Sequence, residues 1–232
     1  MTLKKFEKLA KNARHFLTFM IYYYIINGVL PMEVYKFCPR TYVGSNSYVL
    51  LDGDEAAIVD PSITYAEASS LIGQRRVRYI LLTHCHYDHI RRIDEWVEKT
   101  GAEVIIGESD LGGLSSPIVN CYRSFLGTDD GYFGRATGVK TGVGLPLGNT
   151  VIRVISTSGH TAGGVSYYEG GSLFVGDTVF AAGGWGRCDL PGGDELTLFT
   201  SIRRLCELPD GITVYCGHGE DTSTDELKMN FK

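Results

Sequence analysis

Apolar residues in this chain gather in short runs separated by glycine, aspartate and other turn-forming residues, a pattern typical of β-strands. The runs predict strands at Val34–Phe37, Ser47–Leu51, Ala56–Val59, Val77–Leu82, Val104–Ile106, Val151–Ser156, Val165–Tyr168, Ser172–Val175 and Thr213–Cys216. Asp52-Gly53 and Glu169-Gly170-Gly171 are turn signals between neighbouring runs. Each of them predicts a β-hairpin.

Stretches with helical spacing of apolar residues lie between these strands. They predict helices at Tyr65–Gln74, Ile90–Lys99 and Glu195–Leu208, the last with Asp194 as its N-cap. Residues 110–126 are expected to be partly helical, and residues 127–148 form a glycine-rich loop. This span is either one wall of a substrate cleft or a surface connection. The order of strands and helices predicts an α/β fold in which two sheets lie between helices.

Histidine and aspartate side chains follow the ends of four predicted strands. His84, His86, Asp88 and His89 come after Val77–Leu82, and the others, one after each of three later strands, are His160, Asp177 and His218. Imidazole and carboxylate are ligands that zinc and similar divalent metals prefer. Four such groups within residues 84–89 would crowd one ion but can be shared between two. A single histidine of this kind is more often a core or loop residue, but the whole set predicts a metal site.

Composition narrows the class of protein. The chain has 232 residues, 44% of them hydrophobic and 21% charged, as expected for one globular domain with a sizeable core. The net charge of −5 argues against a nucleic acid as partner, because phosphate binding needs a basic face. The six cysteines show no close, paired spacing, so we expect reduced thiols in a cytoplasmic protein.

The first 31 residues differ from the rest. A basic stretch, residues 1–14, precedes a mostly apolar one, residues 16–30, which is short for a bilayer span of about 20 residues. The pattern is compatible with membrane association, with an extra helix or with an upstream extension of the reading frame. We expect residues 1–31 to be a non-catalytic extension without a membrane span, and residues 32–232 to form the functional domain.

The order of these motifs resembles that of the metallo-β-lactamase superfamily. His-x-His-x-Asp-His at 84–89 is followed by Gly159-His160, Gly176-Asp177-Thr178 and Gly217-His218. The longer strings Ser-Gly-His-Thr-Ala-Gly (158–163) and Gly-Arg-Cys-Asp-Leu-Pro-Gly-Gly-Asp (186–194) resemble the glyoxalase II-like branch, the hydroxyacylglutathione hydrolase-like proteins. The resemblance runs from about Met32 to the C-terminus. It implies an αββα sandwich, with two mixed β-sheets flanked by helices.

The resemblance also implies a site with two divalent metal ions, zinc first and iron or manganese as alternatives. The first ion would be held by His84, His86 and His160, the second by Asp88, His89 and His218, with Asp177 bridging both. Catalytic roles would fall to His84, His86 and Asp88. Arg187 would contact the substrate, or else be a structural residue paired with Asp189 or Asp194.

The implied activity is thioester hydrolysis by a hydroxide that bridges the metals, on a small S-2-hydroxyacyl-glutathione-type substrate. A thiolate leaves without a strong general acid, and none is obvious in the sequence. The alternative is a persulfide dioxygenase with one iron held by His84, His160 and Asp177. A non-catalytic binding protein is disfavoured because every ligand position is filled. Lactam hydrolysis is disfavoured because the relevant lactamases use a cysteine as a ligand of the second metal or depart from the pattern elsewhere, whereas this chain has Asp177 and His218.

Overall fold

The computed structural model describes residues 31–39 and 43–232, of which Val34–Lys232 belong to one compact unit. The predicted extension, residues 1–31, lies outside the described residues except for Pro31. In the described part of the chain, no helix is long and apolar enough to cross a membrane.

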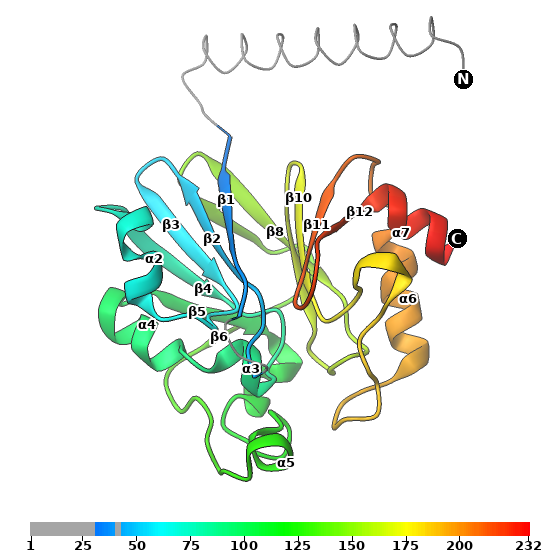
Figure 1. Cartoon of the computed structure of the whole chain (residues 1–232), viewed down its shortest axis with the longest axis horizontal. Coiled ribbons are helices and arrows are strands. Elements are labelled where there is room, and N and C mark those ends of the chain that lie inside the picture. Colours follow the sequence, from blue (N-terminus) through cyan, green and yellow to red (C-terminus); the bar gives the residue numbers. More distant parts are fainter. Residues whose placement is uncertain (1–30, 40–42) are drawn as a thin grey trace, which may run out of the picture. The chain divides into compact units, whose positions relative to one another are not determined.

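Two six-stranded sheets form the centre of the unit, as Figure 1 shows. The first sheet contains, in spatial order, β1 (Glu33–Phe37), β2 (Ser47–Asp52), β3 (Glu55–Val59), β4 (Arg76–Leu81), β5 (Glu103–Gly107) and β6 (Thr137–Val139). The second contains β12 (Thr222–Ser223), β11 (Thr213–Cys216), β10 (Ser172–Gly176), β9 (Val165–Glu169), β8 (Thr150–Ser156) and β7 (Gly144–Leu147). Both sheets are mixed, because β3, β4, β5 and β6 pair in parallel, as do β10 and β11, while β2–β3 and β7 to β10 pair antiparallel.

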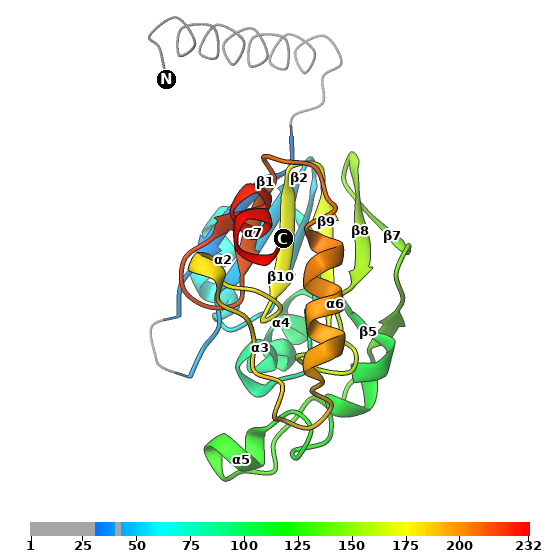
Figure 2. The ribbon, with the colours of Figure 1, turned by 90° about the vertical axis from the view of Figure 1, so that its right-hand side faces the viewer.

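Helices cover the outer face of each sheet (Figures 1 and 2). On the first sheet lie α2 (Tyr65–Ile72) and α4 (Ile93–Thr100), and on the second lie α6 (Glu195–Leu205) and α7 (Thr224–Phe231). Shorter turns are α3 (Tyr87–Ile90), α5 (Tyr122–Leu126) and the 3₁₀ helices η1 (Glu108–Gly113) and η2 (Ala181–Gly183). The predicted αββα sandwich is therefore confirmed.

Each sheet is buried on both faces, which explains its nearly continuous apolar strands. In β2, Val49 and Leu51 pack with Ile72 of α2 and Trp96 of α4 in one core. The neighbouring residue Tyr48 points the other way, as alternation along a strand requires, and its ring lies 5.4 Å from that of Phe174 in the second sheet. A separate core joins the second sheet to α6 and α7.

The predicted strands are all present, whereas some helix predictions need correction. The helix predicted at Ile90–Lys99 is present as α4 but begins at Ile93, because Arg92 lies outside the helical region with φ −116° and ψ 12°. The helix nearest the histidines is instead α3, whose N-cap is His86. Asp194 is the N-cap of α6, as predicted, since its Oδ1 accepts a hydrogen bond from the Thr197 backbone N–H at 2.7 Å.

Short elements were missed where the sequence signal is weak. The glycine-rich loop 127–148 contains β6 and β7, and the C-terminal tail contains β12 and α7. Gly144 and Pro146 are poor strand formers, yet β7 pairs with β8 over its whole length. Pairing with a neighbouring strand determines whether such a segment becomes a strand, because the pairing provides its backbone hydrogen bonds and buries its side chains.

Candidate metal centre

All seven predicted ligands lie at one edge of the sandwich, in the loops that follow strands. His84 and His86 lie in the loop after β4, and Asp88 and His89 are in α3 directly behind it. His160 lies between β8 and β9, Asp177 follows β10, and His218 follows β11. The first sheet thus supplies four of these side chains and the second supplies three.

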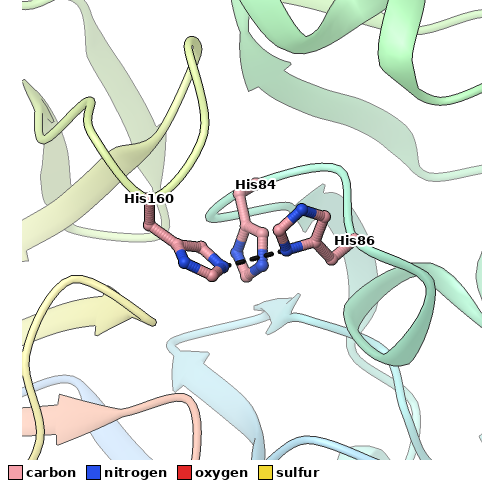
Figure 3. Close-up of side chains that lie close together, drawn as sticks. All are labelled: His84, His86 and His160. Atoms are coloured by element: carbon pink, nitrogen blue, oxygen red, sulfur yellow. Dashed lines mark hydrogen bonds between the residues drawn. The ribbon is translucent and has the colours of Figure 1, made fainter. Parts of the chain in front are cut away.

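Six of the side chains form two groups of three, and a further set, His84, His89 and Asp177, overlaps both groups. In the three-histidine group, His84, His86 and His160 face one another, as Figure 3 shows, and His86 Nδ1 lies 2.9 Å from His160 Nε2. In the mixed group, Asp88, His89 and His218 approach one another, with His218 Nε2 3.0 Å from Asp88 Oδ2. In each group the potential ligand atoms lie within 4.8 Å of one another.

Asp177 lies between the two groups. Its Oδ2 is 3.8 Å from Nε2 of His160 in the three-histidine group. The same oxygen is 3.4 Å from Nε2 of His218, and Oδ1 is 3.3 Å from Nε2 of His89, both in the mixed group. A carboxylate with one group on either side has the placement that a bridging ligand requires.

The unsatisfied polar atoms fit bound metal. Nε2 of His84, Nε2 of His86, Nε2 of His89 and Oδ1 of Asp177 are buried without a hydrogen-bond partner. Buried polar atoms almost always have a partner, so several such atoms in one place need an explanation. Divalent cations held by nitrogen and oxygen donors would satisfy Nε2 of His84, Nε2 of His89 and Oδ1 of Asp177.

Neighbouring groups fix the tautomers of two histidines. His160 Nδ1 lies 2.8 Å from the backbone oxygen of Arg187, which can only accept a hydrogen bond, so Nδ1 carries the proton. His89 Nδ1 lies 2.8 Å from Oδ2 of Asp60 and donates to that carboxylate. In both rings Nε2 is then the nitrogen with a free lone pair, and it faces the centre.

Asp60 is a site residue that the sequence analysis missed, because Asp60-Pro61-Ser62 has the composition of an ordinary turn. It is 2% exposed, and besides His89 it accepts hydrogen bonds from Thr83 N at 2.8 Å and Thr83 Oγ1 at 2.7 Å. Thr83 Oγ1 in turn lies 3.1 Å from His84 Nδ1. The available signal was its place at the end of a strand, β3, like the ligands themselves.

Electrostatics separates His84 and His86 from His89 and His218. Burial, followed by the neighbouring imidazoles, lowers the pKa of His84 well below its usual value and that of His86 to about 3. Burial opposes charge on His89 and His218 too, but the carboxylates beside them prevail, raising the pKa of His89 strongly and that of His218 to about 9. His84 and His86 therefore offer neutral imidazoles at pH 7, whereas metal binding to His89 and His218 would displace protons.

Close packing explains one of the glycines that precede ligands. A Cβ on Gly217 would lie 2.1 Å from Asp177 Oδ1 and 2.9 Å from His89 Cε1. Any side chain there would displace both residues. Cys85, which lies between two candidate ligands, points away from the centre, since a Cβ built on Gly113 of η1 would lie 2.5 Å from its sulfur.

A cleft of about 290 Å³ opens onto the centre. Besides candidate ligands from both groups, its lining includes Tyr87, Cys121, Phe125, Phe180, Arg187 and Leu190. Cys121 and Phe125 come from residues 110–126, so this part of the span forms a wall of the cleft. Residues 127–148 contain β6 and β7.

Arg187 lies at the rim of the cleft and is paired. Its Nε and Nη2 donate to Oδ1 and Oδ2 of Asp189 at 2.7 and 2.6 Å, and its guanidinium lies 5.9 Å from the centre of the Phe125 ring. Asp194, the other candidate partner, caps α6 instead.

Comparison with known proteins gives consistent results. The sequence model described as "Metallo-beta-lactamase superfamily" matches residues 40–218. The chain is 32% identical over 184 residues to a probable metallo-hydrolase, YqgX, of Bacillus subtilis (strain 168), covering 78% of this chain and 87% of that protein. It is 33% identical over 195 residues to a hydroxyacylglutathione hydrolase of Brucella ovis, covering 81% of this chain and 66% of that protein.

Two solved structures are also similar. The BLEG-1 B3 metallo-beta-lactamase has a TM-score of 0.75 and 30% identity, covering 84% of this chain and 95% of its own. TTHA1623, solved in a di-iron-bound form, has a TM-score of 0.71 and 26% identity, covering 86% and 98%.

Proposed function

The chain belongs to the metallo-beta-lactamase superfamily as a metallo-hydrolase, and we propose that it hydrolyses small acyl-thiol thioesters at a centre that holds two divalent metal ions. The observation that carries this proposal is the position of Asp177, which lies within 3.8 Å of a histidine nitrogen in both the three-histidine group and the mixed group. The hydroxyacylglutathione hydrolase among its relatives supports a thioester as substrate.

The donor set fits two ions of the zinc, iron or manganese type. His84, His86 and His160 would hold one, and Asp88, His89 and His218 would hold the other, with Asp177 between them. Bound there, such ions lower the pKa of water towards 7 and polarise a carbonyl group.

The chain's own residues supply orientation and exclusion of water. The Arg187 carbonyl and the Asp60 carboxylate hold the proton on Nδ1 of His160 and His89, so Nε2 of each ring stays free for a cation. Tyr87, Phe125 and Phe180 line the cleft with aromatic surface that would cover an acyl group. A thiolate leaving group, whose thiol has a pKa of about 8.5, needs no strong acid beside it.

The first experiment is metal analysis of the full chain produced with zinc, iron and manganese available, combined with three assays: hydrolysis of an S-2-hydroxyacyl-glutathione thioester, hydrolysis of a β-lactam, and O₂ uptake with glutathione persulfide. The β-lactam is included because the solved structure with 30% identity is named a lactamase. We expect about two ions per chain and thioester hydrolysis. One iron per chain with O₂ uptake and no thioesterase activity would contradict the proposal.

The variant His218→Ala tests the role of the mixed group. We expect it to lose one ion per chain and to lower kcat by about 10²–10³-fold, the usual effect of removing one stabilising electrostatic group. Met229→Ala is the control, because that side chain is 79% exposed on α7. Full thioesterase activity in His218→Ala would rule out a hydrolase that needs two metals.

We further propose that Arg187 binds a carboxylate of the thiol carrier, competing with Asp189 for it. Arg187→Ala should raise KM for the glutathione thioester by about tenfold or more, since a charged hydrogen bond contributes about 1.5–3 kcal/mol. Asp189→Ala should lower KM by freeing the guanidinium. Both effects should vanish with a thioester whose carrier has no carboxylate, and equal changes in the two variants would indicate a structural pair instead.

A further inference from the structure

Asp110 is a buried carboxylate on an element that carries no candidate ligand. It lies in η1, directly after β5, and is 2% exposed. Nothing in the chemistry proposed for the cleft uses it, and it does not line the cleft. A buried carboxylate needs hydrogen-bond partners to offset the loss of hydration, so its contacts show what it holds.

The contacts of Asp110 join two loops. Oδ2 accepts a hydrogen bond from the backbone N–H of Cys85 at 3.2 Å, and Cys85 lies between His84 and His86. The same oxygen accepts from Thr161 Oγ1 at 2.7 Å, and Oδ1 accepts from Gly163 N at 2.6 Å, both in the loop of His160. One carboxylate therefore contacts both loops that supply the three-histidine group.

The packing leaves little freedom for this arrangement. A Cβ on Gly163 would lie 2.3 Å from the backbone nitrogen of Asp110 and 2.7 Å from its side-chain Cβ. A Cβ on Gly107, at the end of β5, would lie 1.8 Å from the Gly163 carbonyl oxygen. The His160 loop thus rests directly on η1, and a longer or reoriented side chain at position 110 would push the loop away.

Figure 3 shows why the relative placement of the two loops matters, because His84 and His86 face His160 from separate parts of the chain. From these contacts we infer that Asp110 is a positioning residue that holds the three-histidine group, and not the mixed group, in the arrangement that binds metal. The inference rests on the proposed metal site. A second carboxylate, Asp60, contacts Thr83 and His89, which lie at the two ends of the segment that follows β4.

The test measures zinc affinity one group at a time in the full chain. The variant His218→Ala retains the complete three-histidine group, and His86→Ala retains the complete mixed group. Asp110→Asn is added to each, and zinc affinity is measured by competition with a chelator. In the unmodified chain, one oxygen of Asp110 accepts from the backbone N–H of Cys85 and the other from that of Gly163. In Asp110→Asn, the side-chain NH₂ group replaces one of these oxygens in either orientation of the amide, so at least one backbone N–H loses its acceptor.

We expect Asp110→Asn to weaken zinc binding about 10–100-fold in the His218→Ala background, the range typical of residues that orient metal ligands. In the His86→Ala background the affinity should stay unchanged. Cobalt(II) bound in the His218→Ala background should show altered d–d absorption bands. Asp52→Asn is the matched control. Asp52 is a carboxylate, 4% exposed, at the turn between β2 and β3, and Asp60 lies at the other end of this hairpin.

Equal weakening in both backgrounds would mean that Asp110 only stabilises the fold, and no change in either would mean that it does not position the ligands. Each result overturns the inference. Absence of zinc binding in both single variants and in the unmodified chain would overturn the proposed centre as well. If Asp110→Asn does not fold, Thr161→Val removes one of the three hydrogen bonds and should weaken the same group, to a smaller degree.

Discussion

Asp60 determines which nitrogen of His89 faces the candidate metal centre. Its carboxylate accepts a hydrogen bond from Nδ1 of His89 and two more from the backbone N–H and the hydroxyl of Thr83. One buried side chain therefore orients both the imidazole and the start of the loop after β4. Asp60 has a φ of 50°, unusual for a residue other than glycine. A strained backbone conformation of this kind persists where surrounding contacts stabilise it, and here those contacts are with the site.

Replacing Asp60 by asparagine should loosen His89. We expect zinc affinity of the mixed group to fall about 10–100-fold in the His86→Ala background, because the amide cannot accept from every donor that the carboxylate serves. Chelator competition measures the change, and Asp52→Asn serves as the control. A zinc affinity equal to that of His86→Ala alone would show that His89 keeps its orientation without the Asp60 carboxylate.

At the scale of elements, β2 connects the two sheets through Tyr48. The hydroxyl donates to the Cys216 carbonyl at the end of β11, at 2.6 Å, and lies 3.0 Å from Asp221 Oδ1. The ring packs edge-on against Phe174 and Tyr215, with centroids 5.4 and 5.1 Å away. Burial, and then the charge of Asp221, raises the pKa of Tyr48 far above the usual 10.0.

The raised pKa of Tyr48 predicts a loss of stability at alkaline pH. Above about pH 10 the unfolded chain loses the phenolic proton while the folded chain keeps it, so the unfolded state binds fewer protons and the free energy of unfolding falls as pH rises. This contribution is fully present below pH 10 and declines above it by up to about 1.4 kcal/mol per pH unit. Urea unfolding between pH 7 and 11 should show a shallower decline for Tyr48→Phe than for the unmodified chain.

Tyr48→Phe should also lower the free energy of unfolding at pH 7 by about 1 kcal/mol through its lost hydrogen bonds. Met229→Ala on α7 is the control, because that side chain is 79% exposed and has no titratable group, and it should leave the alkaline decline unchanged. Identical slopes for Tyr48→Phe and the unmodified chain would show that Tyr48 ionises as readily in the folded state as in the unfolded one.

For the whole molecule, the candidate ligands come from both sheets. The loop after β4 and helix α3 bring four of them from the first sheet, and the loops after β8, β10 and β11 bring three from the second. Each group of three takes two ligands from the first sheet and one, His160 or His218, from the second, so neither sheet alone completes a group. Metal held at this edge would therefore join the two layers, and it would bind the folded chain in preference to the unfolded one.

Metal removal should therefore lower the melting temperature. With zinc at about 100 times its Kd, binding contributes about 2.7 kcal/mol, which for a chain of this size corresponds to about 5–10 °C. Calorimetry with and without a chelator measures the difference, and His84→Ala should reduce it, because only the mixed group then keeps all its ligands. A melting temperature that does not respond to chelation would contradict metal binding at this edge.

The family and the location of the site follow from the sequence because their signals are local. An apolar run that ends in histidine or aspartate predicts both a buried strand and a side chain at its end, and this pattern occurs before His84, His160, Asp177 and His218. The fold then brings together the five segments that carry these side chains: the loop after β4, helix α3 and the loops after β8, β10 and β11. The αββα sandwich was predicted from the order of these motifs and is confirmed.

Tertiary structure alone decided the features that depend on partners distant in sequence. Asp60 and Asp110 look like ordinary turn residues, and their contacts with His89 and with the His160 loop lie 29 and 51 or more residues away. The strand β7 gains its structure from its pairing with β8. Patterns along the chain report burial and local propensity, whereas hydrogen bonds between distant segments depend on a geometry that exists only after the sheets have packed.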